Sequence, residues 1–360
     1  MKKEKRRLRV LAGPGAVRRL RKHGLEPEHV GAVFGASGAA KWLAICGLDQ
    51  SIFGQWLSET KHEILLYGTS VGAFKLAAAC RKDPEASLQA LADTYIRQSY
   101  TDGAGSDDIE RETERMLDVI FADGGVEEIL RHPILRYSCG TALTKGMMAS
   151  QSRLLQYLAV ARAMATNILG RNVHRGIMER VVFADARSHF PLKSVDAYGD
   201  TQIALNEHNL RMAVKASGSI PIMMHSVKNV PGGPRGEYVD GGLVDYHPAP
   251  GWFWDSQDLI LYPHFYAHLQ SGWFDKYYKN RKARGNLLDN VILLAPSEFH
   301  LSTLKLGRIP DRRDFKTMHG DDELRMALWQ DAVDQSRFLG EEFMQIVRSG
   351  DIAASLEEIY

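Results

Sequence analysis

A serine stands between two glycines in the stretch HEILLYGTSVGAFKLAAAC, which covers residues 62–80. Its start, ILLY, is typical of a buried strand, and AFKLAAAC is typical of a helix. In this strand-to-helix context G-x-S-x-G predicts a nucleophile elbow, a sharp turn that exposes the serine hydroxyl. Glycines suit positions 68 and 72, because a Cβ at Gly68 or Gly72 would crowd the backbone. Ser70 is therefore our candidate nucleophile, at the N-terminus of a helix whose dipole favours negative charge.

A second glycine-rich turn, FGASGAAKW at residues 34–42, also lies between a short apolar run and a helical pattern. Successive backbone N–H groups in such a turn can point at an anion, such as a tetrahedral oxyanion. A phosphate cradle is the alternative, but the chain lacks G-x-x-x-x-G-K-[ST] and this loop lacks G-x-G-x-x-G. We expect Ser37, Gly38 and Ala39 to form an oxyanion hole.

The strongest signal for a partner base is EYVDGGLVDYHPAP, residues 237–250. Asp240 followed by Gly241 and Gly242 is also compatible with a simple turn at a strand end. A Ser-Asp-His order remains formally open, because histidines follow Asp240. They include His247, His264, His268 and His300.

Four motifs together give a more specific signal: FGASGAAK, GTSVG, VKASGSIP and YVDGG, in this order. The combination resembles the patatin-like phospholipase family over residues 29–248. The resemblance implies a three-layer α/β/α sandwich with a mainly parallel central sheet. It also implies a Ser-Asp dyad in which Ser70 is the nucleophile and Asp240 its base, with no cofactor and no metal. The segment around Ser217 and Pro221 is then scaffold that shapes the pocket.

The glycine-rich loop departs from the family pattern. The family's loop usually reads like G-G-G-x-[RK]-G, whereas Ala39, Ala40 and Lys41 follow Gly38 here. Backbone N–H groups can still stabilise an oxyanion after this change. A dyad also makes chemical sense without histidine, because a carboxylate in a partly desolvated pocket can accept the serine proton.

Alternation of strands and helices predicts an α/β protein with a parallel sheet. We expect a basic segment at 1–28, a catalytic core at 29–250, and the remainder of the same domain at 251–360. Residues 84–170 look mostly helical, and residues 321–350 predict a long amphipathic helix with an acidic first turn. Further strands are expected at 180–185, 201–206, 258–264 and 290–296.

Charge and cysteine content limit the partners and the compartment. The net charge of the 360 residues is +1, which gives no general reason to expect nucleic acid. Residues 1–22 hold ten basic residues and one acidic residue, which suits peripheral contact with an anionic membrane. A solvated basic end is the alternative. Cys46, Cys80 and Cys139 predict buried thiols rather than a disulfide framework. Without a signal peptide pattern, we expect a cytoplasmic protein.

Aromatic residues concentrate directly after the Asp240 loop. Residues 251–280 hold ten of the chain's 32 aromatics. Trp and Tyr suit an acyl-chain pocket or a membrane interface, and we expect one of these roles. A core-packing cluster is the alternative.

These observations predict a lipid acyl hydrolase that cleaves carboxylic esters through an acyl-enzyme on Ser70. Two alternatives remain: an acyltransferase that uses the same serine, and a lipid-binding protein that kept the fold without catalysis.

Overall fold

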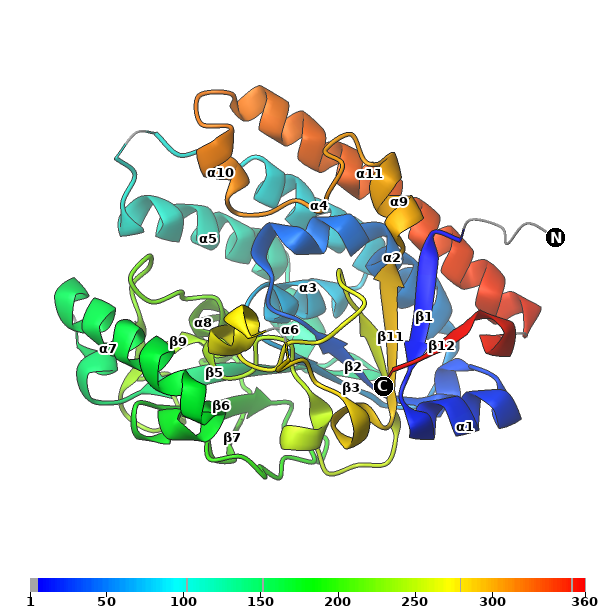
Figure 1. Ribbon diagram of the computed structural model, residues 1–360, viewed down its shortest axis with the longest axis horizontal. Coiled ribbons are helices and arrows are strands. Elements are labelled where there is room, and N and C mark those ends of the chain that lie inside the picture. The colour runs from blue at the N-terminus through cyan, green and yellow to red at the C-terminus, as the bar shows by residue number, and fades with distance from the viewer. Residues whose placement is uncertain (1–5, 102, 151, 279, 351, 360) are drawn as a thin grey trace.

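The computed structural model describes residues 6–101, 103–150, 152–278, 280–350 and 352–359 (Figure 1). Its strands are β1 (Leu8–Ala12), β2 (Val30–Gly35), β3 (Ile64–Gly68), β4 (Leu135–Arg136), β5 (Ser138–Thr144), β6 (Met178–Ala184), β7 (Thr201–Ala204), β8 (Val227–Lys228), β9 (Glu237–Asp240), β10 (Leu259–Pro263), β11 (Val291–Pro296) and β12 (Leu356–Glu358). Its α-helices are α1 (Pro14–His23), α2 (Cys46–Gln50), α3 (Val71–Ala79), α4 (Pro84–Ile96), α5 (Ser106–Phe121), α6 (Gly125–Leu130), α7 (Arg153–Thr166), α8 (Leu210–Ser217), α9 (Glu298–Thr303), α10 (Asp314–Thr317) and α11 (Asp322–Ser349).

The strands join one mixed sheet in the order β12-β1-β11-β10-β2-β3-β5-β6-β7. Pairing is parallel from β11 through β10, β2 and β3 to β5, and antiparallel where β1 meets β11 and where β5 meets β6. The predicted α/β class with a mainly parallel sheet is therefore confirmed. Strands from residues 1–28 and 251–360 lie in the same sheet as those of the central segment.

The predicted strands after residue 179 correspond to β6, β7, β10 and β11. The expectation that residues 84–170 are mostly helical is incomplete, because β5 runs through this range. Its sequence, SCGTALT, does not alternate regularly between polar and apolar residues and has few β-branched residues. All seven residues are nevertheless buried, since β5 is a central strand with both faces covered.

Helices α2, α3, α4, α5 and α11 gather on one side of the sheet (Figure 1). The predicted C-terminal helix is confirmed as α11, and Asp321 caps it by accepting a hydrogen bond from the Leu324 N–H. Helix α3 follows β3 directly and packs beside β2 and β3. The buried helix α3 thus fixes the position of the turn that precedes it.

Five of the ten aromatic residues of 251–280 are buried, which favours the core-packing alternative over an acyl-chain pocket. The expected role at a membrane interface stays a prediction. The Phe253 ring lies 5.0 Å from that of Tyr67, and the Trp254 ring lies 5.1 Å from that of Phe34. Phe34 and Tyr67 are paired across β2 and β3, so these contacts fill one face of the sheet. Burial of large aromatic area against the sheet explains the high aromatic density of the segment.

Cys46, Cys80 and Cys139 are free and buried, as predicted. Among the helices that the structure describes, none has both the length and the apolar character needed to cross a bilayer.

Candidate active site

Ser70 lies in the turn between β3 and α3 with φ 53° and ψ −131°. Positive φ is uncommon for residues other than glycine and occurs preferentially at functional sites. The neighbouring backbones are very close: a Cβ on Gly72 would lie 2.3 Å from the Gly35 carbonyl oxygen. A Cβ on Gly68 would lie 2.5 Å from the Gly72 carbonyl carbon. Both glycines of the predicted elbow are therefore required by backbone contact.

The sheet brings Asp240 to this turn. Gly68 at the end of β3 pairs with Cys139 at the start of β5. Strand β9 runs antiparallel to β5, and Asp240 at the end of β9 pairs with Thr141 in the middle of β5. Two segments 170 residues apart in sequence thereby meet at one edge of the sheet.

Ser217 holds the turn at Ser70 in place through hydrogen bonds. The Ser70 N–H donates to both the carbonyl oxygen and the Oγ of Ser217, each at 3.0 Å. The Ser217 hydroxyl in turn donates to the Gly140 carbonyl oxygen at 2.7 Å. This agrees with the interpretation of the A-S-G-S-I-P segment as scaffold.

The Ser70 hydroxyl donates to Asp240 Oδ2 at 2.7 Å. The other carboxylate oxygen, Oδ1, accepts the Gly242 N–H at 2.7 Å. Burial raises the pKa of Asp240 from 3.8 to about 6, although both hydrogen bonds favour the charged form. A carboxylate of this kind is ionised at neutral pH and is a stronger base than an exposed aspartate.

A buried ion-pair network holds the loop after Asp240. Asp245 accepts hydrogen bonds from Arg180 Nε at 2.7 Å and Nη2 at 2.9 Å, and Tyr67 donates to it at 3.1 Å. The carbonyl oxygen of Asp245 accepts from the Thr69 hydroxyl at 2.7 Å, next to Ser70. The network therefore links the serine turn to the aspartate loop.

The predicted oxyanion loop lies beside the elbow, but Ser37 does not fit its expected role. The Ser37 N–H donates to the Tyr246 carbonyl oxygen at 2.8 Å, so it is not available to an oxyanion. Within the described residues the Gly38 N–H has no hydrogen-bond partner. Ala39 begins a 3₁₀ helix, where the first N–H groups lack intrahelical acceptors, and has φ 52°.

In the described part of the chain, neither the serine nor the aspartate forms a hydrogen bond with His247, His264, His268 or His300. His247 Nδ1 instead accepts the Gln270 N–H at 3.0 Å. Burial lowers all four histidine pKa values: well below 6.5 for His247, to about 3 for His264, to about 4 for His268 and to about 4 for His300.

A cavity of about 310 Å³ lies against Ser70 and is mostly apolar. Helices α4 and α5 form much of its wall, and none of the described residues of 251–280 lines it. The lining side chains and glycine are Ala39, Ser70, Val71, Phe74, Leu91, Tyr95, Gln98, Tyr100, Ala104, Ile109, Thr113, Met116, Gly218, Ile220, Met223, Met224, Arg312, Phe315 and Lys316.

The C-terminal part of the chain also contributes to this cavity, without any signal in the sequence. Arg312, Phe315 and Lys316 come from α10 and the segment before it. Arg312 is close enough to Asp240 to favour its ionised form. Lys41, the basic residue that follows the altered glycine loop, forms an ion pair with Asp311 at 2.7 Å. No motif marks these residues, because only tertiary packing brings them to the site.

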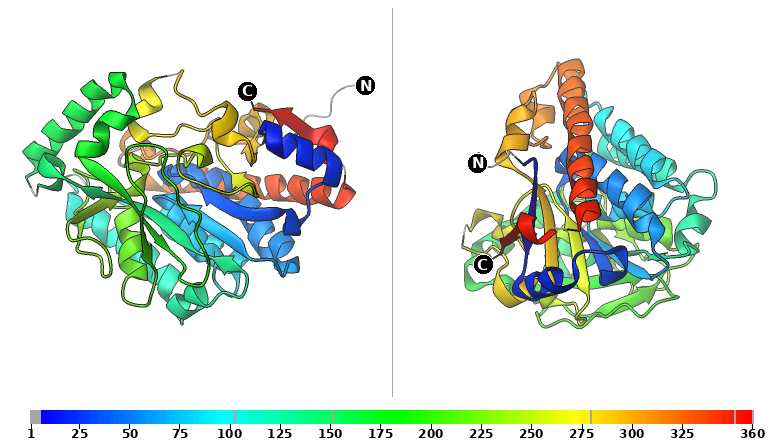
Figure 2. Two further views of the ribbon diagram at one scale, coloured as in Figure 1. Left: turned by 90° about the horizontal axis from the view of Figure 1, so that it is seen from below. Right: turned by 90° about the vertical axis from the view of Figure 1, so that its right-hand side faces the viewer.

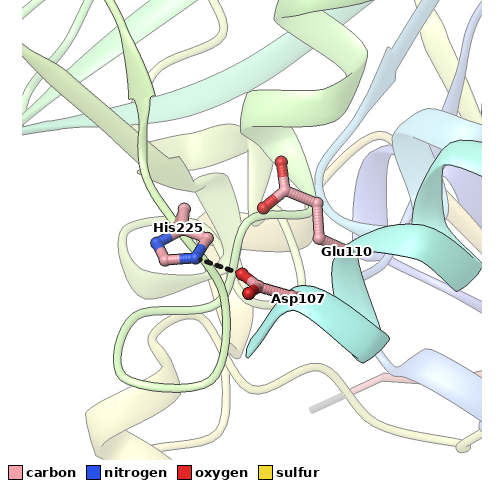
Figure 3. Close-up of side chains that lie close together, drawn as sticks. All are labelled: Asp107, Glu110 and His225. Carbon is pink, nitrogen blue, oxygen red and sulfur yellow. Dashed lines mark hydrogen bonds and ion pairs between the residues drawn. The ribbon is translucent and has the colours of Figure 1, made fainter. Parts of the chain in front are cut away.

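One group of side chains near the cavity wall has metal-ligand types: Asp107, Glu110 and His225 (Figure 3). His225 Nε2 lies 2.8 Å from Asp107 Oδ1, and Lys215 forms an ion pair with Glu110. The lysine ammonium already neutralises one carboxylate, so the group gives no argument for a bound cation. It does link α5 to the segment that follows α8.

The sheet, the serine turn and the aspartate define an α/β/α protein with a buried serine–aspartate pair. The chain matches the patatin-like phospholipase family model over residues 8–251. It therefore belongs to the patatin-like phospholipase family, whose members are lipid hydrolases.

Among solved structures, the chain is similar to VipD from Legionella pneumophila, at 12% sequence identity and a TM-score of 0.37. That match covers 97% of this chain and 72% of the VipD chain. A search of the curated proteins finds no match.

Proposed function

We propose that this protein cleaves carboxylic esters of acyl lipids through an acyl-enzyme on Ser70, with Asp240 as the base. The observation that carries the proposal is the 2.7 Å hydrogen bond from the Ser70 hydroxyl to Asp240, beside a mostly apolar cavity. Nucleophile and base within this distance are the signature of an activated serine.

In the acylation step, Ser70 Oγ attacks the ester carbonyl carbon while its proton moves to Asp240 Oδ2. The N–H groups of Gly38 and Ala39 are suited to stabilise the oxyanion. The tetrahedral intermediate then expels the alcohol, which takes the proton from Asp240. Water then attacks the acyl carbon and gives a proton to Asp240 Oδ2. When the second tetrahedral intermediate collapses, Asp240 returns this proton to the leaving Ser70 Oγ, and the fatty acid is released.

The cavity suits an acyl chain. Its helical walls present Leu91, Ile109 and Met116, whereas charged side chains are limited to Arg312 and Lys316. Arg312 has no hydrogen bond or ion pair with any described side chain. An acyl chain in the apolar part with an anionic head group near these two cations would match this distribution of charge.

A fluorophosphonate probe tests the proposal most directly, since it labels an activated serine. We expect labelling of the wild type and none of Ser70→Ala. An unlabelled wild type would favour the non-catalytic lipid-binding alternative. Product analysis with and without an added alcohol or thiol acceptor separates hydrolysis from acyl transfer.

The acidic side of the pH profile should report Asp240. Because its pKa is about 6, kcat/KM should fall about tenfold per pH unit below that value. His264, His268 and His300 have pKa values of about 3, about 4 and about 4, so none of them accounts for a midpoint near 6. Circular dichroism across the same range controls for unfolding. A kcat/KM that stays constant down to about pH 5 would contradict the assignment.

The cavity predicts chain-length selectivity that one methionine substitution can test. Met224→Ala should reduce kcat/KM for long-chain esters about four- to tenfold more than for acetyl or butyryl esters, because each buried CH₂ contributes about 0.8 kcal/mol. Met148→Ala is a matched control, since Met148 is also buried but belongs to a separate core cluster. Equal losses across chain lengths in the Met224 variant would assign Met224 to folding alone.

A further inference from the structure

Helix α7 and the turn after it expose an unusual amount of apolar surface. Nine of the thirteen exposed large apolar side chains in the described residues lie between positions 147 and 173. Leu154 is 67% exposed and Leu169 is 77% exposed. Soluble proteins expose such residues singly, whereas contiguous patches mark interaction sites. We call this set the α7 surface: Met147, Leu154, Leu155, Tyr157, Leu158, Met164, Ile168, Leu169 and Val173.

The way α7 packs explains the patch. Ala159 and Ala163 are its buried residues, so the helix rests on the protein through small side chains. The large side chains, such as Tyr157 and Leu158, are left facing outward. Figure 1 shows α7 at the lower left edge of the molecule, away from the helices that cover the sheet.

The exposed charges of this segment that lack an ionic partner are positive: Lys145 pairs with Glu179, and the buried Arg171 pairs with Asp196 and Asp245. Residues 145–177 contain five Lys or Arg residues and no Asp or Glu, although the whole chain has 44 acidic residues. Arg162 and Arg175 are exposed and form no ion pair with a described carboxylate. A second copy packed face to face would bring like charges together, which is unfavourable. Apolar side chains flanked by cations match an anionic lipid surface.

Helix α7 contacts the segment that forms part of the cavity wall. Gln156 on α7 accepts the Ile222 N–H at 3.2 Å, and Ile220, Met223 and Met224 of the same segment line the cavity. Arg153 donates to the Ser106 hydroxyl at 2.8 Å, where α5 begins. Figure 3 shows His225, at the end of this segment, beside Asp107 of α5.

The basic N-terminal segment is a separate surface. β1 and α1 lie at the opposite end of the molecule from α7 in two views (Figures 1 and 2). Arg9 forms an ion pair with Glu357 at 2.5 Å, and Arg21 with Glu358 at 3.1 Å. Part of the charge counted over residues 1–22 is thus neutralised, and residues 1–5 lie outside the described residues. Membrane contact through this segment stays a prediction.

We propose that the α7 surface docks on an anionic lipid bilayer, with α7 lying in the plane of the interface. Leu154, Leu158 and Ile168 would enter the boundary between head groups and acyl chains, while Arg162 and Arg175 contact lipid phosphates. Docking would place the cavity wall next to the substrate lipids. The reason for docking rests on the proposed function, but binding itself does not require turnover.

Vesicle sedimentation of the full-length Ser70→Ala protein tests the docking without hydrolysis. The vesicles are phosphatidylcholine alone or with about one third phosphatidylglycerol. We expect binding to the anionic vesicles that weakens as salt rises. Adding Leu154→Asp and Leu158→Asp should weaken this binding at least about tenfold. Leu324→Asp is the matched control: Leu324 is 48% exposed on α11 and lies outside the α7 surface, so binding should not change.

Several outcomes would overturn the proposal. The first is that the parent protein does not bind the vesicles, and the second is that the α7 double variant binds them as well as the Leu324 control does. The third is that the parent protein is a dimer in sedimentation velocity and the α7 double variant is a monomer. The fold of the Leu154→Asp/Leu158→Asp enzyme, with Ser70 intact, is checked by circular dichroism and by its hydrolysis of a soluble short-chain ester. Both should match the wild type. Absence of ester hydrolysis by the wild type together with normal vesicle binding would refute the proposed function alone.

Discussion

Asp240→Asn is expected to abolish ester turnover as completely as Ser70→Ala does, with kcat reduced at least about 10⁴-fold. The amide keeps the size of the side chain and its contact with the Gly242 N–H, but it cannot accept the proton of Ser70. Residues that act as one unit give non-additive losses, so the double variant should be little worse than either single variant. Steady-state kinetics on an acyl ester measures all three.

The same substitution should stabilise the fold at neutral and alkaline pH. The Asp240 carboxyl has a pKa of about 6 in the folded protein because it is buried, against an ordinary value of 3.8. The folded state therefore binds more protons between these two values, and the stability of the wild type falls as pH rises through this range. Above about pH 7, Asp240→Asn should gain up to about 3 kcal/mol, and the gain should vanish below about pH 4. Urea unfolding at several pH values measures this.

Histidine variants provide the contrast for the dyad. Single substitutions of His247, His264, His268 and His300 should each leave most of the activity of the folded protein, because none forms a hydrogen bond with Ser70 or Asp240 in the described structure. If one of them proved as indispensable as Ser70 while Asp240→Asn kept substantial turnover, the dyad assignment would be wrong. A Ser-Asp-His mechanism would then replace it.

Gly72→Ala should cost about 3 kcal/mol or more of unfolding free energy. The new Cβ would lie 2.3 Å from the carbonyl oxygen of Gly35 and 2.9 Å from that of Ala36. These are backbone atoms of β2 and its following turn, so they cannot rotate away as a side chain could. The gain in helix propensity from glycine to alanine, about 1 kcal/mol, is too small to offset the overlap.

A control glycine separates this overlap from a general effect of alanine. Gly176 has open space where a Cβ would stand and does not need a positive φ, so Gly176→Ala should change stability by less than about 0.5 kcal/mol. Urea unfolding of both variants provides the measurement. A Gly72→Ala protein as stable as the wild type would show that α3 and β2 can move apart, contrary to the packing described.

Much of the fold and part of the site followed from local sequence. The G-x-S-x-G motif after an apolar run indicated the strand, the turn and the helix around Ser70, because each of these depends on neighbouring residues. Buried strands such as β10 and β11 were recognisable as short apolar runs. β5 was missed, since its small residues carry no such pattern and only burial on both faces makes it a strand.

Tertiary structure decided what distant residues do together. The pairing of β9 with β5 is what sets Asp240 2.7 Å from the Ser70 hydroxyl, and burial of the carboxyl raises its pKa to about 6. The sequence predicted an acyl-chain pocket or a membrane interface for the aromatic segment, but its Phe253 and Trp254 rings pack against the sheet. Arg312 and Phe315 reach the cavity without any motif. Composition shows which residues prefer burial, but it does not specify which buried surface they meet. That choice depends on long-range packing, which short-range sequence patterns do not encode.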